Sequence, residues 1–263
     1  MLLEVKKGDY IWMRDDGIYY LGYVGDNLRC DYNSSNDAPE YEESNLRYKF
    51  DFSIDALEHD AANQIIGIEW KPIGDESEVP GAVATAFIRG RTIQRINKSY
   101  MFEYAEYAFW GNPMVLENSN EAYLQQLFYN CLSPSDCEDL VCLYLYDKAN
   151  YIAIPSTNKI ATELYECVLV NPSNGKLAYP QVKKGRDNLN INDYMELIKD
   201  NPNKEVYLFT TEGKLQGDIH INNIHGISPY ELYNWTEEKI KNNSFLIPEG
   251  IVKWYKLIHS SEK

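Results

Sequence analysis

The stretch Tyr165–Gly185, YECVLVNPSNGKLAYPQVKKG, determines how we interpret the rest of the chain. Two apolar-rich runs, Tyr165–Val170 and Lys176–Lys183, lie on either side of the turn-forming residues Asn171–Gly175. Such a pattern predicts two β-strands joined by a tight turn. We therefore expect the two strands to be central in the sheet of this half of the chain.

Polar residues within these two strands indicate a candidate site. Side chains two apart on a strand point to the same face, so Gln181 and Lys183 project together while Val182 points the other way. Glu166 lies near the start of the partner strand. A carboxylate on one strand and Gln-x-Lys on the next can gather a metal ion and an ammonium around one phosphate. The pattern therefore predicts phosphodiester hydrolysis.

Two alternatives concern the carboxylate. Glu163 competes with Glu166, but it lies three residues earlier and would face away on a regular strand. We favour Glu166 because it is embedded in the apolar run, where an unpaired charge is costly. Glu166 and Lys183 also fit a simple cross-strand ion pair, and the presence of Gln181 on the face of Lys183 favours the catalytic interpretation.

Four segments of this half of the chain resemble motifs of one enzyme family. Through the order and spacing of these segments, residues 133–254 resemble the nuclease domain of Mrr-like restriction endonucleases. This family is a branch of the PD-(D/E)XK superfamily whose last motif is often Gln-x-Lys. The resemblance implies an α/β restriction-endonuclease-like fold, with a mixed central sheet flanked by helices, and a metal-dependent DNA endonuclease of restriction or anti-phage type. The segments are SPSDCEDL at Ser133–Leu140, PSTNKIATELYE at Pro155–Glu166, QVKKG at Gln181–Gly185 and VYLFTTEG at Val206–Gly213.

The resemblance also implies roles for individual residues. A glutamate of the first helix helps to complete the metal site in this family, and Glu138 matches it, although an acid there also fits a solvated side chain. We assign Glu166 as the main metal ligand, Glu138 as a direct or water-mediated ligand, and Gln181 as a neutral oxygen ligand or water-orienting group. Lys183 would place an ammonium beside the attacking water or the scissile phosphate. Oxygen ligands indicate Mg²⁺ or Mn²⁺.

Two features depart from the family pattern. Pro180 cannot donate to a strand ladder, so we expect the second strand to start at Gln181 or to bulge there. The net charge of −15 disfavours contact with nucleic acid. The alternative function is therefore a catalytically inactive protein of the same fold that binds DNA or a partner protein, and RNA as a substrate is not excluded by any residue.

Basic residues gather in two stretches that contain no acids, 87–98 and 176–186. Each fits either a solvated surface or a phosphate-binding surface, and the first also fits a braced domain interface. The residues that we predict to contact nucleic acid are Arg89, Arg91, Arg95, Lys184 and Arg186. Since one site cuts one strand, we expect a homodimer.

Residues 1–98 are interpreted as a β-rich recognition domain, a small barrel of SH3-like type, followed by a helical connector at 99–131 and the nuclease domain at 132–263. Asp16-Gly17 between two aromatic runs indicates a hairpin. The expected strands are Tyr10–Met13, Ile18–Val24, Gln64–Lys71 and Ala82–Ile88, and the expected connector helices are Tyr100–Phe109 and Asn120–Cys131. Trp12, Tyr20 and Trp70 fit either the barrel core or a pocket that stacks a flipped or modified base.

The remaining signals concern the helices and the environment of the chain. Ser133, Pro134 and Asp136 predict a capped helix start. No apolar run of 18 residues and no signal peptide occurs, so we expect a cytoplasmic protein without membrane contact. The five cysteines lack CxxC spacing and predict buried thiols in place of a metal site or a disulfide framework. The sequence contains no HExxH, Walker or GxSxG motif. Further elements are expected at Tyr151–Ile154, Ile191–Asp200, Val206–Thr210 and Pro248–Ile258, with a helix starting at Ser228-Pro229.

Overall fold

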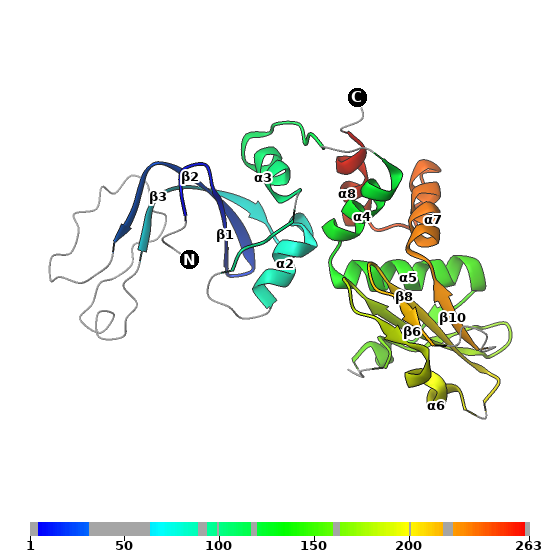
Figure 1. Ribbon diagram of the computed structural model, residues 1–263. Coiled ribbons are helices and arrows are strands. Elements are labelled where there is room, and N and C mark those ends of the chain that lie inside the picture. The colour runs from blue at the N-terminus through cyan, green and yellow to red at the C-terminus, as the bar shows by residue number, and fades with distance from the viewer. Residues whose placement is uncertain are drawn as a thin grey trace, which may run out of the picture. The chain divides into compact units, whose positions relative to one another are not determined.

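The computed structural model describes residues 5–31, 64–88, 94–98, 100–116, 120–159, 164–199, 201–217 and 223–260. The chain divides into two compact units, Met1–Leu116 and Glu117–Lys263. Figure 1 shows the elements of each unit in chain order. The segment 99–131, which we expected to be a connector, supplies helix α3 (Met101–Trp110) to the first unit and helix α4 (Glu121–Cys131) to the second.

The first unit contains a three-stranded antiparallel sheet in the order β1-β2-β3. Its strands are β1 (Tyr10–Asp15), β2 (Ile18–Asp31) and β3 (Gln64–Gly74). Asp16 and Gly17 have φ angles of 44° and 81°, which are the positive values that a type I′ hairpin turn requires. The predicted hairpin is therefore confirmed. The described residues of this unit supply three strands, and a closed barrel stays a prediction.

The strand expected at Ala82–Ile88 is wrong, because these residues belong to helix α2 (Gly81–Ile88). Three alanines give the segment a strong helix propensity, and a short apolar run does not distinguish a strand from a buried helix. The carbonyl of Pro80 accepts the N–H groups of Val83 and Ala84 at 2.8 and 3.2 Å and begins the helix. A short 3₁₀-helix, η2 (Glu76–Glu78), precedes it.

Helix α3 packs against the sheet of this unit. Leu21 of β2 forms a buried cluster with Ala105 and Phe109 of α3. The ammonium of Lys71 on β3 donates to the carbonyls of Ala108 and Phe109 at 2.8 and 2.9 Å, which satisfies carbonyls at the end of the helix. Sheet and helix are thus joined by both apolar and polar contacts.

The second unit is an α/β structure built on a five-stranded mixed sheet in the order β10-β8-β6-β5-β4. Strands β4, β5 and β6 form an antiparallel meander, whereas β6, β8 and β10 run parallel. Figure 1 shows helices on both faces of this sheet. The mixed central sheet flanked by helices agrees with the predicted α/β class. The strands are β4 (Ile152–Ala153), β5 (Leu169–Val170), β6 (Leu177–Lys183), β8 (Lys204–Thr210) and β10 (Ile224–Ile227).

Helix α5 (Pro134–Ala149) covers one face of this sheet. Its predicted start is confirmed, because the N–H of Asp136 donates to the Ser133 hydroxyl at 3.1 Å and the N–H of Ser133 donates to the Asp136 carboxylate at 2.7 Å. Helix α7 (Pro229–Lys241) packs on α5, and α8 (Glu249–His259) packs on α4. Among the described residues, none of the helices combines the length and the apolar character needed to cross a membrane.

Shorter elements complete the second unit. The helix expected at Ile191–Asp200 is divided between the 3₁₀-helix η4 (Ile191–Tyr194) and α6 (Met195–Ile198), on the sheet face opposite α5. The others are η3 (Pro155–Lys159), β7 (Leu189–Asn190) and β9 (Leu215–Gln216).

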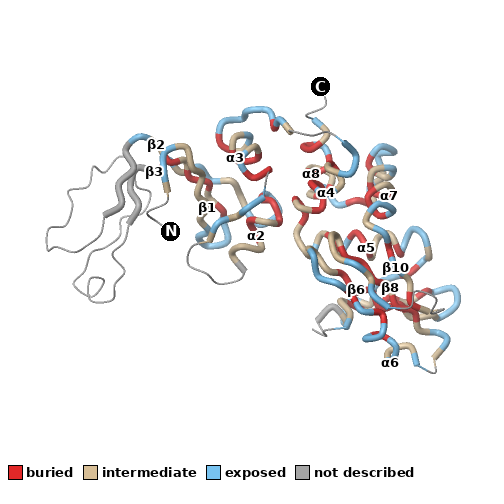
Figure 2. The backbone as a smooth tube through the Cα atoms, in the orientation of Figure 1, coloured by how far each residue is buried: buried red, intermediate tan, exposed pale blue. Residues whose placement is uncertain are grey.

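The register of β6 and β8 assigns each side chain to one face of the sheet. Tyr179 lies beside Val206 and packs with Tyr194 in a buried cluster on the α6 face. Val182 lies beside Phe209 on the face toward α5. Figure 2 shows buried residues along these central strands. By the same alternation, Gln181 and Lys183 belong to the α6 face and Pro180 to the α5 face.

The central hairpin is confirmed, because β5 and β6 pair antiparallel, but its first strand is limited to Leu169–Val170 and is shorter than the predicted Tyr165–Val170. Strand β6 includes Pro180, so the expected start or bulge at Gln181 is wrong. The carbonyl of Pro180 accepts the N–H of Glu166 at 2.9 Å. Since the N and C=O groups of one strand residue point to the same edge, the missing N–H faces the irregular segment before β5 and not β8. Proline is therefore tolerated here.

Candidate functional site

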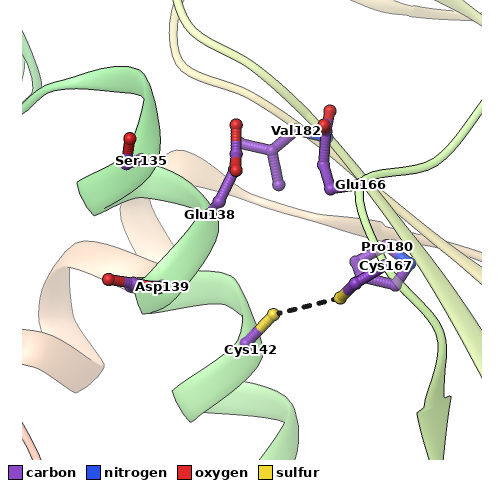
Figure 3. Close-up of a pocket in the computed structure, with 8 residues that line it drawn as sticks. All are labelled: Ser135, Glu138, Asp139, Cys142, Glu166, Cys167, Pro180 and Val182. Atoms are coloured by element: carbon purple, nitrogen blue, oxygen red, sulfur yellow. Dashed lines mark hydrogen bonds between the residues drawn. The ribbon is translucent and has the colours of Figure 1, made fainter. Parts of the chain in front are cut away.

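A pocket of about 280 Å³ lies between helix α5 and strand β6. Figure 3 shows the carboxylates of Glu138 and Glu166 near Val182, with a pair of cysteines further along the pocket. Helix α5 supplies one wall, and β6 with the segment before β5 supplies the other. The lining residues are Ser135, Glu138, Asp139, Cys142, Glu166, Cys167, Pro180 and Val182.

Glu166 lies in irregular backbone beside the edge of β6, and not in the strand predicted at Tyr165–Val170. One of its carboxylate oxygens, Oε1, accepts a hydrogen bond from Gln181 Nε2 at 3.0 Å. The N–H of Val182 lies 3.4 Å from the same oxygen. The backbone at Glu166 lies beside β6, where its N–H donates to the Pro180 carbonyl at 2.9 Å, but it is not a regular strand, and β6 fixes the orientation of the Glu166 carboxylate.

Glu138 faces the pocket from the second turn of α5. Burial raises the pKa of this carboxyl to about 7, and the negative charges of Glu166 and Asp139 contribute to the rise. The charge of Lys183 acts in the opposite direction on the same pKa. The negative charges of Glu138 and Glu166 therefore repel each other across a pocket partly shielded from solvent, and a bound cation would offset this repulsion.

The structure separates Gln181 and Lys183 from the pocket wall. Both lie on the α6 face of β6, whereas Pro180 and Val182 line the pocket. Gln181 is 1% exposed and reaches Glu166 through its amide nitrogen. Its Oε1 atom is buried and accepts no hydrogen bond from the described residues. Lys183 is the last residue of β6 and is partly exposed. It affects the site electrostatically, because its positive charge lowers the pKa of Glu138.

These donors fit a hard divalent cation. Mg²⁺ is usually held by one or two carboxylates, together with water and substrate oxygens. Glu138 and Glu166 provide such a pair, and the Gln181 amide oxygen is a buried acceptor that receives no hydrogen bond from the residues the structure describes. The part of the chain that the structure describes contains no group of three or more His, Cys, Asp and Glu side chains placed to hold a metal. In the pocket, the candidate set is thus the two carboxylates, and Gln181 reaches it through its hydrogen bond to Glu166.

Sequence reasoning predicted two of the eight residues that line this pocket and missed the other six, among them Pro180 and Val182 of β6. On α5, Ser135 and Cys142 lie three residues before and four residues after Glu138, and Asp139 lies four residues after Ser135 and three before Cys142, so these side chains share one face of the helix. Helical spacing around Glu138 could have identified this face. Cys167 follows Glu166 directly, but the irregular backbone that brings it into the pocket leaves no periodic signal.

The structure places the basic residues predicted to contact nucleic acid in different surroundings. The ammonium of Lys184 donates to the carbonyls of Asn130 and Leu132 at the end of α4, so the structure gives it a structural role. Arg186 is exposed and lies 3.3 Å from Glu212, and Arg95 is also exposed. Arg89, Arg91 and the alternative ligand Glu163 lie outside the described residues.

We expect Lys184→Met to lower the free energy of unfolding by about 1–2 kcal/mol, because carbonyls at the end of α4 lose a charged donor. Chemical denaturation of the two proteins measures the change. Lys199→Met is the matched control, since this exposed lysine pairs with Glu196 at 3.1 Å and its loss should cost less than about 0.5 kcal/mol. Unchanged stability of the Lys184 variant together with weaker DNA binding would restore the nucleic-acid role.

The three aromatic residues proposed for base recognition do not form one pocket. Trp12 pairs with Leu21 across β1 and β2, and Gly22 pairs with Trp70 across β2 and β3. Because neighbouring residues on a strand face opposite sides, Trp12 lies on one face of the sheet, and Tyr20 and Trp70 lie on the other. Trp12 packs in the cluster beneath α3 with its ring stacked on Tyr104, 6.2 Å between centroids.

Trp12→Ala is therefore expected to destabilise the first unit by about 2–4 kcal/mol, through lost burial and an unfilled cavity. Thermal and chemical denaturation measure this loss. Phe102→Ala is the control, because Phe102 on α3 is 58% exposed and its removal should cost less than about 1 kcal/mol. A Trp12→Ala protein of full stability that has lost substrate selection would support the ligand-pocket interpretation.

Comparison of the chain with protein-family models, with curated protein sequences and with solved structures found no significant match in any of the three.

Proposed function

We propose that the chain is a metal-dependent endonuclease that hydrolyses phosphodiester bonds in DNA, with a restriction-endonuclease-like second unit and a first unit that selects the substrate. The observation that carries the proposal is the pair of carboxylates in the pocket. Glu166 is oriented by two groups of β6 and faces Glu138, whose raised pKa reports burial and negative charge around it. The Gln-x-Lys sequence at the end of β6 supports the same chemistry.

Each residue has a defined task in this proposal. Glu166 and Glu138 would hold Mg²⁺ or Mn²⁺, which supplies Lewis-acid activation of water and neutralises phosphate oxygens. Gln181 keeps the Glu166 carboxylate in place through its amide nitrogen. Lys183 places a positive charge at the end of β6, where it stabilises negative charge that develops on the phosphate.

The acidic chain constrains how DNA is bound. With a net charge of −15, binding depends on local positive charge and on cations held by the acids. Arg186 and Arg95 are exposed cationic groups on the two units and are candidates for phosphate contact. A second copy of the chain would place a second site for the other DNA strand, so the proposal includes a homodimer.

A specific observation favours the runner-up, a catalytically inactive protein that binds DNA or a partner protein. Gln181 and Lys183 lie on the face of β6 opposite the pocket. A lysine that does not approach the scissile phosphate would leave the carboxylates without their electrostatic partner. Binding would then persist without cleavage.

The test is incubation of the full chain with plasmid and phage DNA, modified and unmodified, with Mg²⁺, with Mn²⁺ and with a chelator. The proposal predicts cleavage with metal and none with chelator. Salt-dependent DNA binding without cleavage of any substrate would replace it with the binding function. A parallel set of single-stranded and structured RNA substrates distinguishes RNA cleavage from DNA cleavage.

A further inference from the structure

Two thiols meet inside the pocket. Cys142 of α5 and Cys167 lie with their Sγ atoms 3.8 Å apart. Figure 3 shows the two side chains directed toward each other from the two walls. Cys142 is partly exposed and Cys167 is 4% exposed, and both line the cavity. These thiols are therefore in contact with each other and with a solvent-accessible space.

The other described cysteines differ in their surroundings. Cys131 and Cys137 are 1% and 0% exposed in the core. Neither lines the pocket. Among the described cysteines, the pair at 142 and 167 therefore combines mutual contact with access to small molecules.

The geometry points to a redox modification site: we propose that Cys142 and Cys167 form a reversible disulfide when the protein meets a hydroperoxide. A disulfide bond is about 2.05 Å long, so the sulfurs must approach by about 1.8 Å, the difference from 3.8 Å. Cys167 lies outside the regular strand β5, so this approach does not require a strand ladder to break. A hydroperoxide is small enough to enter a cavity of about 280 Å³.

The chemistry balances with the hydroperoxide as the oxidant. The sulfur of one cysteine of the pair, as the thiolate, attacks the peroxide oxygen, the O–O bond breaks, and a sulfenic acid and water (or an alcohol) form. The sulfur of the other cysteine then attacks the sulfenic sulfur, the S–S bond forms, and a second water leaves. Each thiol gives up one proton and one electron, and the peroxide takes up both pairs.

The disulfide would tie together the two elements that carry the carboxylates. Cys142 lies one helical turn after Glu138 on α5, and Cys167 follows Glu166. Oxidation would therefore fix α5 to the segment beside β6 and narrow the pocket between them. Formation of the bond itself does not depend on the proposed nuclease function.

The experiment uses the full chain with Cys30→Ser, which leaves four of the five cysteines. Hydrogen peroxide is expected to lower the free-thiol count from four to two, with the loss of two hydrogen atoms by intact-mass measurement. Peptide mapping should join Cys142 to Cys167, and dithiothreitol should restore both thiols. The oxidised protein should also melt at a higher temperature, because a bond between residues 25 apart in sequence lowers the conformational entropy of the unfolded chain.

Matched variants make the result specific. Cys142→Ser and Cys167→Ser should each show no disulfide and no gain in melting temperature, whereas Cys131→Ala should behave as the parent. The inference is overturned if the four thiols survive, if Cys142 gains oxygen without forming a bond to Cys167, or if the chains become linked to one another. DNA cleavage is not needed for any of these readouts, so a failure here is separate from a failure of the nuclease proposal.

Discussion

Replacement of Glu166 by alanine is expected to reduce metal-dependent DNA cleavage by roughly three orders of magnitude or more, because the pocket loses its best-oriented carboxylate. The same change leaves the Gln181 amide nitrogen and the Val182 N–H without their acceptor. A modest loss of stability, about 1–2 kcal/mol, should therefore accompany the loss of cleavage. Cleavage rates of supercoiled plasmid and denaturation curves measure the two effects.

Two further variants separate chemistry from folding. Glu166→Gln keeps the size of the side chain and one oxygen acceptor, so it should fold like the parent and still lose cleavage. Glu196→Ala removes a carboxylate whose side chain is 82% exposed on α6, and it should cut DNA at the parental rate. Parental cleavage by Glu166→Gln would show that the Glu166 carboxylate is not a ligand of the catalytic metal.

Glu138→Gln is expected to stabilise the protein at pH 8 and to leave its stability nearly unchanged at pH 4. Below its ordinary pKa of 4.5, the carboxyl is protonated in both the folded and the unfolded chain. Between pH 4.5 and about 7 the folded chain holds the proton more tightly, so the stability of the parent falls as the pH rises. The glutamine variant lacks this fall. Because the side chain is only half-buried, solvent screening reduces the gain to on the order of 1 kcal/mol.

Divalent cations provide the second readout for this residue. Mg²⁺ or Mn²⁺ at pH 8 should raise the melting temperature of the parent, because a bound cation offsets the repulsion between Glu138 and Glu166. The rise should be smaller in Glu138→Gln, which offers one charge fewer. An equal rise in both proteins would place cation binding elsewhere on this acidic chain.

The sequence predicted the elements whose signals are local. The capping box at Ser133 and the Asp16-Gly17 turn depend on a few adjacent residues, and both are as expected. Strand β6 was identified by its apolar run, but the position of Pro180 within it was not. Pro180 is accommodated because the segment beside it is not a regular strand, a tertiary feature that periodicity cannot report.

The candidate site was predictable in its residue types and less so in its arrangement. Strand alternation correctly put Gln181 and Lys183 on one face, but the cavity forms on the other face, where α5 packs on Pro180 and Val182. Which face of a central strand adjoins a cavity depends on helix packing. Since β6 has buried residues on both faces, its sequence pattern does not indicate which face that is. The same limit hid Cys167, which reaches the pocket through irregular backbone.

The decisive measurement is the rate at which supercoiled plasmid is cut with Mn²⁺ by the parent, by Lys183→Ala and by Lys199→Ala, side by side. Lys199 is a matched exposed lysine, 60% exposed, on the α6 side of the sheet. The account predicts cleavage by the parent and by Lys199→Ala, and a loss of about 10²–10³-fold in Lys183→Ala, because charge at the phosphate is no longer stabilised. Equal cleavage by all three proteins, or none by the parent, would contradict it.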